Sequence, residues 1–134
     1  MESANIQLVK DAYAAFLRGD VPAIVAVVDE QVEWQGVIGA EGVMKSAGLR
    51  KGKGAIPGFF ADVASTVEFE AFEPREFVAQ GNQVVAIGRY SGRSAQTRRP
   101  FSMEWVMIFT IEHGKVTRFR EFTDSAQLVR TFAA

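Results

Sequence analysis

The feature that most constrains the fold is a pair of β-strand patterns near the C-terminal end, joined by a short turn. Apolar residues recur with period two over residues 101–111 and again over 116–123. His113 and Gly114 lie between these segments and are typical of a tight turn. The pattern predicts an antiparallel hairpin. Because apolar side chains fall on both of its faces, neither face is expected to lie open to water.

Helical patterns precede these strands. Apolar spacing predicts four helices: one over residues 3–18, one that begins after a cap at Asp20, one over 55–64 and one over 124–132. Before the hairpin it also predicts three strands: one over 31–35, one that begins at residue 67 and bends at Pro74, and one over 84–90. A glycine-rich segment runs up to Gly54 and is expected to hold at most a short helix. Helices followed by an antiparallel meander are an α+β pattern. We therefore predict a single α+β domain over residues 1–134.

Composition excludes several classes of function. The net charge of -1 gives no global field for nucleic acid or an anionic membrane, so neither is an expected partner. With no cysteine and a single histidine among 134 residues, we expect no disulfide, no metal site of the His/Cys type and no cofactor. Neither a signal peptide nor a membrane span is visible, and we expect a cytoplasmic protein. The lysines of GLRKGKG at 48–54, together with Arg93, Arg98 and Arg99, could attract an anionic ligand, although such runs more often form a solvated surface.

The hairpin register predicts which side chains share a face. If Glu112 lies opposite Lys115, then Val106 lies opposite Glu121, Glu104 opposite Thr123, and Ile108 opposite Phe119. A few polar groups in such an apolar lining are typical of a small-molecule pocket. A register slip of one residue would instead exchange Glu121 with Arg120.

Glu121 is the first candidate for catalysis, with Glu104 as its partner. Burial would raise the pKa of either carboxyl group, and two neighbouring carboxylates would raise one of the pKa values further, toward the range useful for proton transfer at neutral pH. The structural alternative, which we weigh equally, is an ion pair between Glu121 and Arg120, Arg118 or Arg89 at a sheet edge.

Asp124 is the third acidic candidate. It ends the last strand, opens the last helix and precedes Gln127 by three residues, which resembles a capping box. We therefore favour a capping role for Asp124 over a catalytic one.

Several aromatic side chains are candidates for the wall of a pocket. Tyr13, Trp34 and Tyr90 combine a large apolar surface with a hydrogen-bonding group, and Phe60 lies on the predicted third helix. Tyr13 could donate a hydrogen bond to a ligand. Ordinary core packing is the alternative for all of these residues, and it is favoured for Phe59.

The order of these motifs resembles the nuclear transport factor two-like superfamily, particularly its SnoaL-like, ketosteroid isomerase-like branch. The resemblance rests on FLRGD at 16–20, V-x-W at 32–34, GKGAIPGFF at 52–60 and HGKVTRFREFTD at 113–124, and it covers nearly the whole chain. It implies a cone, formed by a strongly curved antiparallel sheet around a pocket that the helices close. It also implies a common assembly as a homodimer.

Enzymes of this superfamily use acid/base residues inside the cone. The ketosteroid isomerase machinery does not match, because the positions of its two catalytic acids fall near Trp34 and Val106. The epoxide hydrolases are more similar over residues 120–124, and this resemblance places their pocket carboxylate at Glu121. The arginine and aspartate that they carry on the preceding strand would fall near Ala86 and Gly88, where this chain departs from the pattern.

Three functions follow as alternatives. The first is an enzyme of the isomerase, cyclase, hydrolase or dehydratase type, in which Glu121 moves a proton on an apolar substrate. The second is a noncatalytic dimeric module that binds a hydrophobic ligand. The third is a protein-interaction adaptor. In each case we expect a homodimer that covers the second face of the sheet, because the helices of so small a domain cover only one face.

Overall fold

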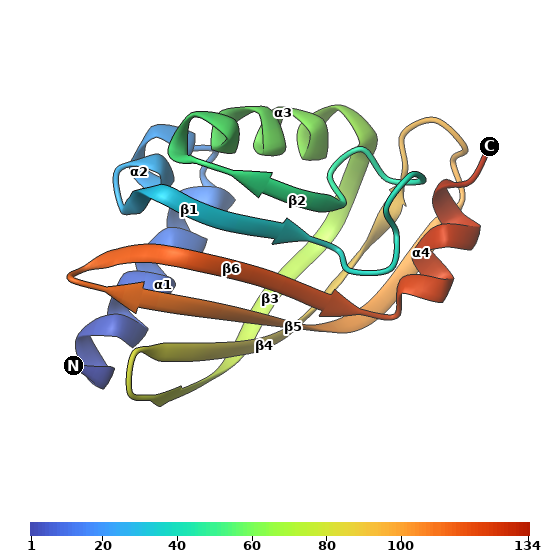
Figure 1. Ribbon diagram of the computed structural model, residues 1–134. Helices are drawn as coiled ribbons and strands as arrows, with labels where there is room; N and C mark the ends of the chain where they lie inside the picture. The colour runs from blue at the N-terminus through green and yellow to red at the C-terminus, as the bar shows by residue number, and fades with distance from the viewer.

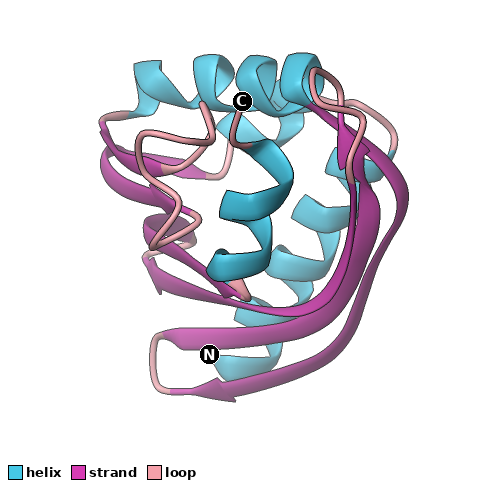
Figure 2. Cartoon of the chain, turned by 90° about the vertical axis from the view of Figure 1, so that its right-hand side faces the viewer, coloured by secondary structure: helices cyan, strands magenta, loops and turns pink.

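The computed structural model describes all 134 residues and consists of one curved sheet with helices along its concave side (Figures 1 and 2). The elements are α1 (Glu2–Leu17), α2 (Val21–Val25), β1 (Val28–Gly36), β2 (Gly48–Lys51), the 3-10 helix η1 (Lys53–Ala55), α3 (Ile56–Thr66), β3 (Val67–Gln80), β4 (Gln83–Ser94), β5 (Pro100–Glu112), β6 (Lys115–Thr123) and α4 (Ser125–Phe132). The six strands lie in the order β2-β1-β6-β5-β4-β3. The predicted α+β class is confirmed. One strand pair, β1 with β6, runs parallel, and the other pairs are antiparallel.

Gly19 and Asp20 form the connection between α1 and α2, and each residue type favours its position there. Gly19 follows α1 with a φ of 74°, a left-handed conformation that favours glycine. The Asp20 side chain then accepts a hydrogen bond from the Ala23 backbone N–H at 3.2 Å and caps α2, which carries Pro22 in its first turn. This sharp connection lets α2 lie against α1 and helps close one end of the sheet (Figure 1).

Glycines and bulges allow the sheet to curve. A Cβ atom at Gly88 would lie 2.3 Å from the Glu73 carbonyl oxygen and 2.5 Å from the Trp105 ring, so only glycine permits this close approach of β3, β4 and β5. The pairing of β3 with β4 shifts between Phe69 and Ala71 and again between Pro74 and Glu76. Bulges of this kind increase the local twist. The long strands consequently bend around the helices (Figure 2).

A further bulge lies in the C-terminal hairpin and changes its predicted register. Ile111 pairs with Val116 and Thr110 with Arg118, which leaves Thr117 as an extra residue in β6. Beyond the bulge, Met107 rather than Val106 lies opposite Glu121. The predicted register was therefore wrong by one residue.

The corrected register divides the residues of β5 between two faces. The concave face carries the buried side chains Phe101, Met103, Trp105, Met107, Phe109 and Ile111. Val106 and Ile108 lie on the convex face and are half-buried, and Glu104 lies there exposed to solvent. Glu104 and Glu121 were predicted to share one face, and this prediction was wrong. The bulge changes the facing of the β6 residues relative to β5, so Glu121 lies on the concave face and Glu104 on the convex face.

One local prediction also needed correction. The glycine-rich segment contains a strand, β2, which pairs with β1 from Gly36↔Gly48 to Glu33↔Lys51. In β3, the bulge between Phe69 and Ala71 turns the rings of Phe69 and Phe72 into the interior, where their centroids lie 5.4 Å apart.

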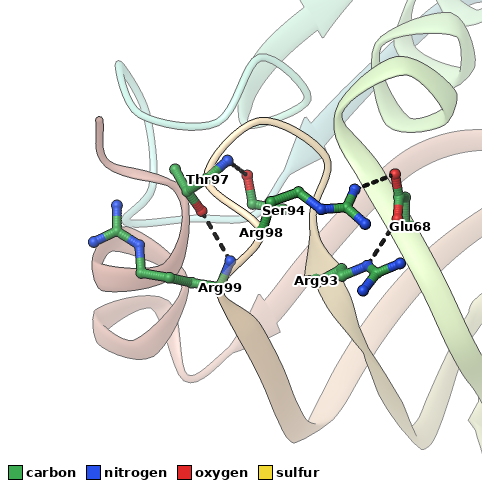
Figure 3. Close-up of polar contacts among 6 residues, drawn as sticks. All are labelled: Glu68, Arg93, Ser94, Thr97, Arg98 and Arg99. Carbon is green, nitrogen blue, oxygen red and sulfur yellow. Dashed lines mark hydrogen bonds and ion pairs between the residues drawn. The ribbon is translucent and has the colours of Figure 1, made fainter.

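The loop between β4 and β5 is tied to β3 (Figure 3) and, through Thr97, to the C-terminal helix. Arg93 and Arg98 both bind the Glu68 carboxylate, at 2.9 and 2.8 Å. Thr97 donates through Oγ1 to the Thr131 carbonyl oxygen at 2.6 Å, and its backbone N–H donates to Ser94 Oγ at 3.1 Å. Two of the arginines suggested for anion binding thus share a carboxylate within the chain.

Candidate functional site

A cavity of about 80 Å³ lies between the concave face of the sheet and the helices, and we call it the main cavity. Its lining residues come from α1, α2, α3 and all strands except β2: Ala12, Tyr13, Phe16, Ile24, Trp34, Phe59, Phe60, Val63, Phe69, Phe72, Tyr90, Met107, Phe109, Phe119 and Glu121. Glu121 is the only charged residue among them. An apolar cavity with a single carboxyl group suits a small, largely apolar molecule.

Glu121 points into this cavity from β6 and is only 7% exposed. Its Oε2 accepts a hydrogen bond from the Tyr90 hydroxyl at 2.9 Å, across from β4. None of the ion pairs of the structure includes Glu121. The alternative of an ion pair with Arg120, Arg118 or Arg89 therefore does not apply. These arginines lie on the convex face, where Arg89 binds Ser102 Oγ at 2.8 Å.

The surroundings of Glu121 change its proton affinity. Burial raises the pKa of its carboxyl group from 4.5 to about 7, and the hydrogen bond from Tyr90 opposes this rise. At neutral pH the protonated and ionised forms are consequently both populated. A carboxyl group in this state can accept or donate a proton.

The two tyrosines of the cavity remain protonated. Burial raises the pKa of Tyr13 and of Tyr90 well above the usual value, and the nearby negative charge of Glu121 raises both further. Tyr13 donates its hydroxyl proton to the Met107 sulfur at 3.1 Å, and a thioether is a weak acceptor. An oxygen atom of a bound molecule would be a stronger acceptor for Tyr13.

Stacked aromatic rings form the wall of the cavity that is built by β1, β6 and α3. Trp34 stacks on Phe119 with ring centroids 4.2 Å apart, and Phe60 packs against Trp34 at 6.0 Å. The Trp34 Nε1 atom is buried without a hydrogen-bond partner. These rings serve both the core and the cavity, so the alternative of core packing does not exclude a binding role.

The structure thus brings together six of the residues selected from sequence, Tyr13, Trp34, Phe60, Tyr90, Phe119 and Glu121. Val106, Ile108 and Glu104 do not line the main cavity, because they occupy the convex face of β5. Asp124 caps α4, as favoured from sequence, since its Oδ1 accepts from the Gln127 backbone N–H at 3.1 Å.

Sequence reasoning missed four lining residues on the strands. Met107 and Phe109 belong to the odd-numbered positions of β5, which are apolar without exception from Phe101 to Ile111, whereas the even positions include Ser102, Glu104 and Thr110. This contrast was a usable signal for the core face. Phe69 and Phe72 carried no such signal, because a bulge decides their direction.

The structure holds no group of three or more histidine, cysteine, aspartate or glutamate residues that could bind a metal ion. None of its helices has the length and apolar character that crossing a bilayer requires.

Comparison with known proteins assigns the family. Residues 9–119 match the SnoaL-like domain, and the chain therefore belongs to the SnoaL-like family. A crystal structure of an NTF2-like protein from Burkholderia xenovorans LB400 is similar, with 36% identity, a TM-score of 0.88 and 98% of both chains covered. No curated protein matches the chain.

Two further structures are similar in fold. TerC, crystallised with polyporic acid, has 25% identity and a TM-score of 0.80, with 96% of this chain and 98% of TerC covered. A protein from Xanthomonas campestris pv. campestris, provisionally named a polyketide cyclase, has 19% identity and a TM-score of 0.78, with 98% of both chains covered. At 19% identity this last similarity supports the fold alone.

Proposed function

We propose that this protein is a cofactor-independent acid/base enzyme that acts on a small, largely apolar molecule in the main cavity. One observation carries the proposal: Glu121 is the only charged group in an apolar cavity, and burial raises its pKa to about 7. Structural ion pairs usually lower the pKa of a carboxyl group, whereas proton-transfer sites tune it toward the working pH. The reaction belongs to the isomerase, cyclase, hydrolase or dehydratase type.

In this proposal each polar group has its own role. Glu121 accepts a proton from the substrate or from water and returns it later in the reaction. Tyr90 holds the carboxyl group in place through its hydrogen bond of 2.9 Å. Tyr13 leaves the Met107 sulfur and donates to an oxygen of the substrate on which negative charge develops.

The size of the cavity limits the substrate. A volume of about 80 Å³ accommodates a small molecule, and a larger substrate needs neighbouring side chains to move. Phe16, Phe60 and Val63 are only half-buried and belong to helices, so they are the lining residues best placed to move. The co-crystallisation of TerC with polyporic acid supports an organic ligand for a protein of this fold.

Turnover of a panel of apolar carbonyl compounds and epoxides tests the proposal. The variant Glu121→Gln removes the titrating group with little change of shape and is expected to lower kcat by a factor of at least ~100. The matched control is Glu104→Gln on the convex face, which is expected to retain activity. Full turnover by Glu121→Gln would refute the catalytic assignment.

A noncatalytic binding module is the second candidate, favoured by the apolar character of the remaining lining residues. This function predicts that hydrophobic ligands bind without chemical change. Binding would then persist in Glu121→Gln, and no compound of the panel would be converted by the wild-type protein.

We also propose a homodimer formed through the convex face of the sheet. Val85, Ile87, Val106, Ile108 and Phe122 are half-buried apolar side chains on neighbouring strands of this face. The helices lie on the other side of the sheet (Figure 2). A second copy of the chain would remove these side chains from water.

A further inference from the structure

A second cavity, of about 40 Å³, lies beside the main cavity and next to α4. Glu121 and Tyr90 line both this cavity and the main cavity. Val37, Ser46 and Leu128 line the second cavity alone. Glu121 therefore belongs to the lining of both cavities.

Ser46 is a buried polar residue without a partner in the chain. It is 4% exposed, lies in the connection between β1 and β2, and its hydroxyl forms none of the side-chain hydrogen bonds of the structure. A hydroxyl group that faces an apolar cavity without a hydrogen-bond partner carries a free-energy cost. A partner inside the second cavity would remove this cost.

Ser46 and Glu121 line the same small cavity, and backbone contacts hold the β1–β2 connection against β1 and β6. A Cβ atom at Gly36 would lie 2.0 Å from the Ser46 carbonyl oxygen, so the Ser46 backbone packs directly on the end of β1. Two residues further along, the Ile38 N–H donates to the Glu121 carbonyl oxygen at 3.2 Å. The connection is thus attached to β6 at the residue whose side chain enters the cavity.

Glu121 also has unused hydrogen-bonding capacity. The chain donates to Oε2 through Tyr90 but provides no donor for Oε1. A buried water molecule needs a space of roughly 10–15 Å³ and two to four polar partners. The second cavity is larger than this, and Ser46, Glu121 and Tyr90 are its polar groups.

We propose that the second cavity is a water-binding site, in which water bridges Ser46 Oγ and the Glu121 carboxyl group. Glu121 then contacts water on one side and the main cavity on the other. If Glu121 is catalytic, a point that rests on the proposed function, its proton exchanges with this water while the substrate fills the main cavity.

A crystal structure at a resolution that shows ordered water tests the site directly. We expect a density peak within hydrogen-bonding distance, about 2.7–3.2 Å, of both Ser46 Oγ and the Glu121 carboxyl group. A second cavity without density, or one filled by rearranged side chains, would overturn the proposal.

Nuclear Overhauser contacts between water and the backbone amides of Val37 and Ser46 provide a second test in solution. The variant Ser46→Ala keeps the space and removes one polar partner, so these contacts should be lost or strongly weakened. Ser125→Ala is the matched control, because Ser125 contacts Gly39 in the same connection but lines neither cavity. Equal contacts in the wild type and Ser46→Ala would overturn the proposed bridge.

The two proposals can fail separately. Ordered water in the second cavity together with full turnover by Glu121→Gln would refute catalysis and leave the water site in place. Loss of turnover in Glu121→Gln with no water beside Ser46 would refute only the water site.

Discussion

The ionised form of Glu121 lowers the stability of the folded protein, because its carboxyl group is buried. Its pKa is about 7 in the folded protein and near 4.5 in the unfolded chain, so the folded state binds the proton more tightly. Folding is therefore favoured while the carboxyl group is protonated. This advantage is lost as the pH rises from about 4.5 to about 7, and the difference corresponds to about 3 kcal/mol.

The first prediction concerns Glu121→Gln. At pH 5 the free energy of unfolding of the variant should be close to that of the wild type. At pH 8 the variant should be more stable, by up to about 3 kcal/mol, because glutamine cannot ionise. Urea denaturation at the two pH values measures this difference. A variant that is less stable than the wild type at pH 8 would contradict it.

At the level of elements, the bulge in the last hairpin sets the face of the sheet on which the Glu121 side chain lies. Thr117 is the extra residue, and Arg118 already lies opposite Thr110. Removal of Thr117 should therefore leave Arg118 to Thr123 in register, with Glu121 still on the concave face.

The second prediction follows from this geometry. The deletion of Thr117 should give a folded protein with a modest loss of stability, and circular dichroism and thermal unfolding would measure it. The matched change is one alanine inserted between Arg118 and Phe119, which would turn Phe119 and Glu121 to the convex face and should prevent folding. Folding of the insertion variant with unfolding of the deletion variant would contradict this account.

The helix cap at Asp124 gives the third prediction. Asp124→Ala should lower the free energy of unfolding by about 1 kcal/mol, because α4 loses the acceptor for its Gln127 N–H. Asp124→Asn should restore most of this stability. Neither variant should change kcat on a substrate found by the panel, and a large fall in kcat for both would support a catalytic role instead.

The elements also show what could be predicted from sequence. Apolar spacing and turn residues located the helices and long strands, because burial on one face imposes a regular period. The bulges beside Phe69 and at Thr117 left no such trace, since one extra residue changes the facing of side chains but not the local composition. Glu121 and Phe119 were correctly predicted to share one face, because both follow the same bulge, whereas Glu104, Val106 and Ile108 lie on the other strand.

At the scale of the whole molecule, the convex face remains without cover in the monomer. The fourth prediction is that the protein forms a dimer in solution and that Ile108→Lys shifts it toward the monomer. A buried charge without a partner would make the interface unfavourable. Light scattering after gel filtration gives the mass. Glu104→Gln, on the same face, is the control and should remain dimeric, and a monomeric wild-type protein would refute the proposed interface.

The central claim concerns the whole cavity, because the pKa of Glu121 depends on all the rings that exclude water from it. The most direct measurement is a pH titration of the carboxyl carbon of Glu121 by NMR on protein labelled at glutamate, with Glu121→Gln to assign the signal. The fifth prediction is a pKa of about 7 in the wild type and a higher value in Tyr90→Phe, since the Tyr90 hydrogen bond lowers it. A pKa near 4.5 in the wild type would contradict the account, because Glu121 would then be an ordinary ionised carboxylate without the proton affinity that the proposed chemistry requires.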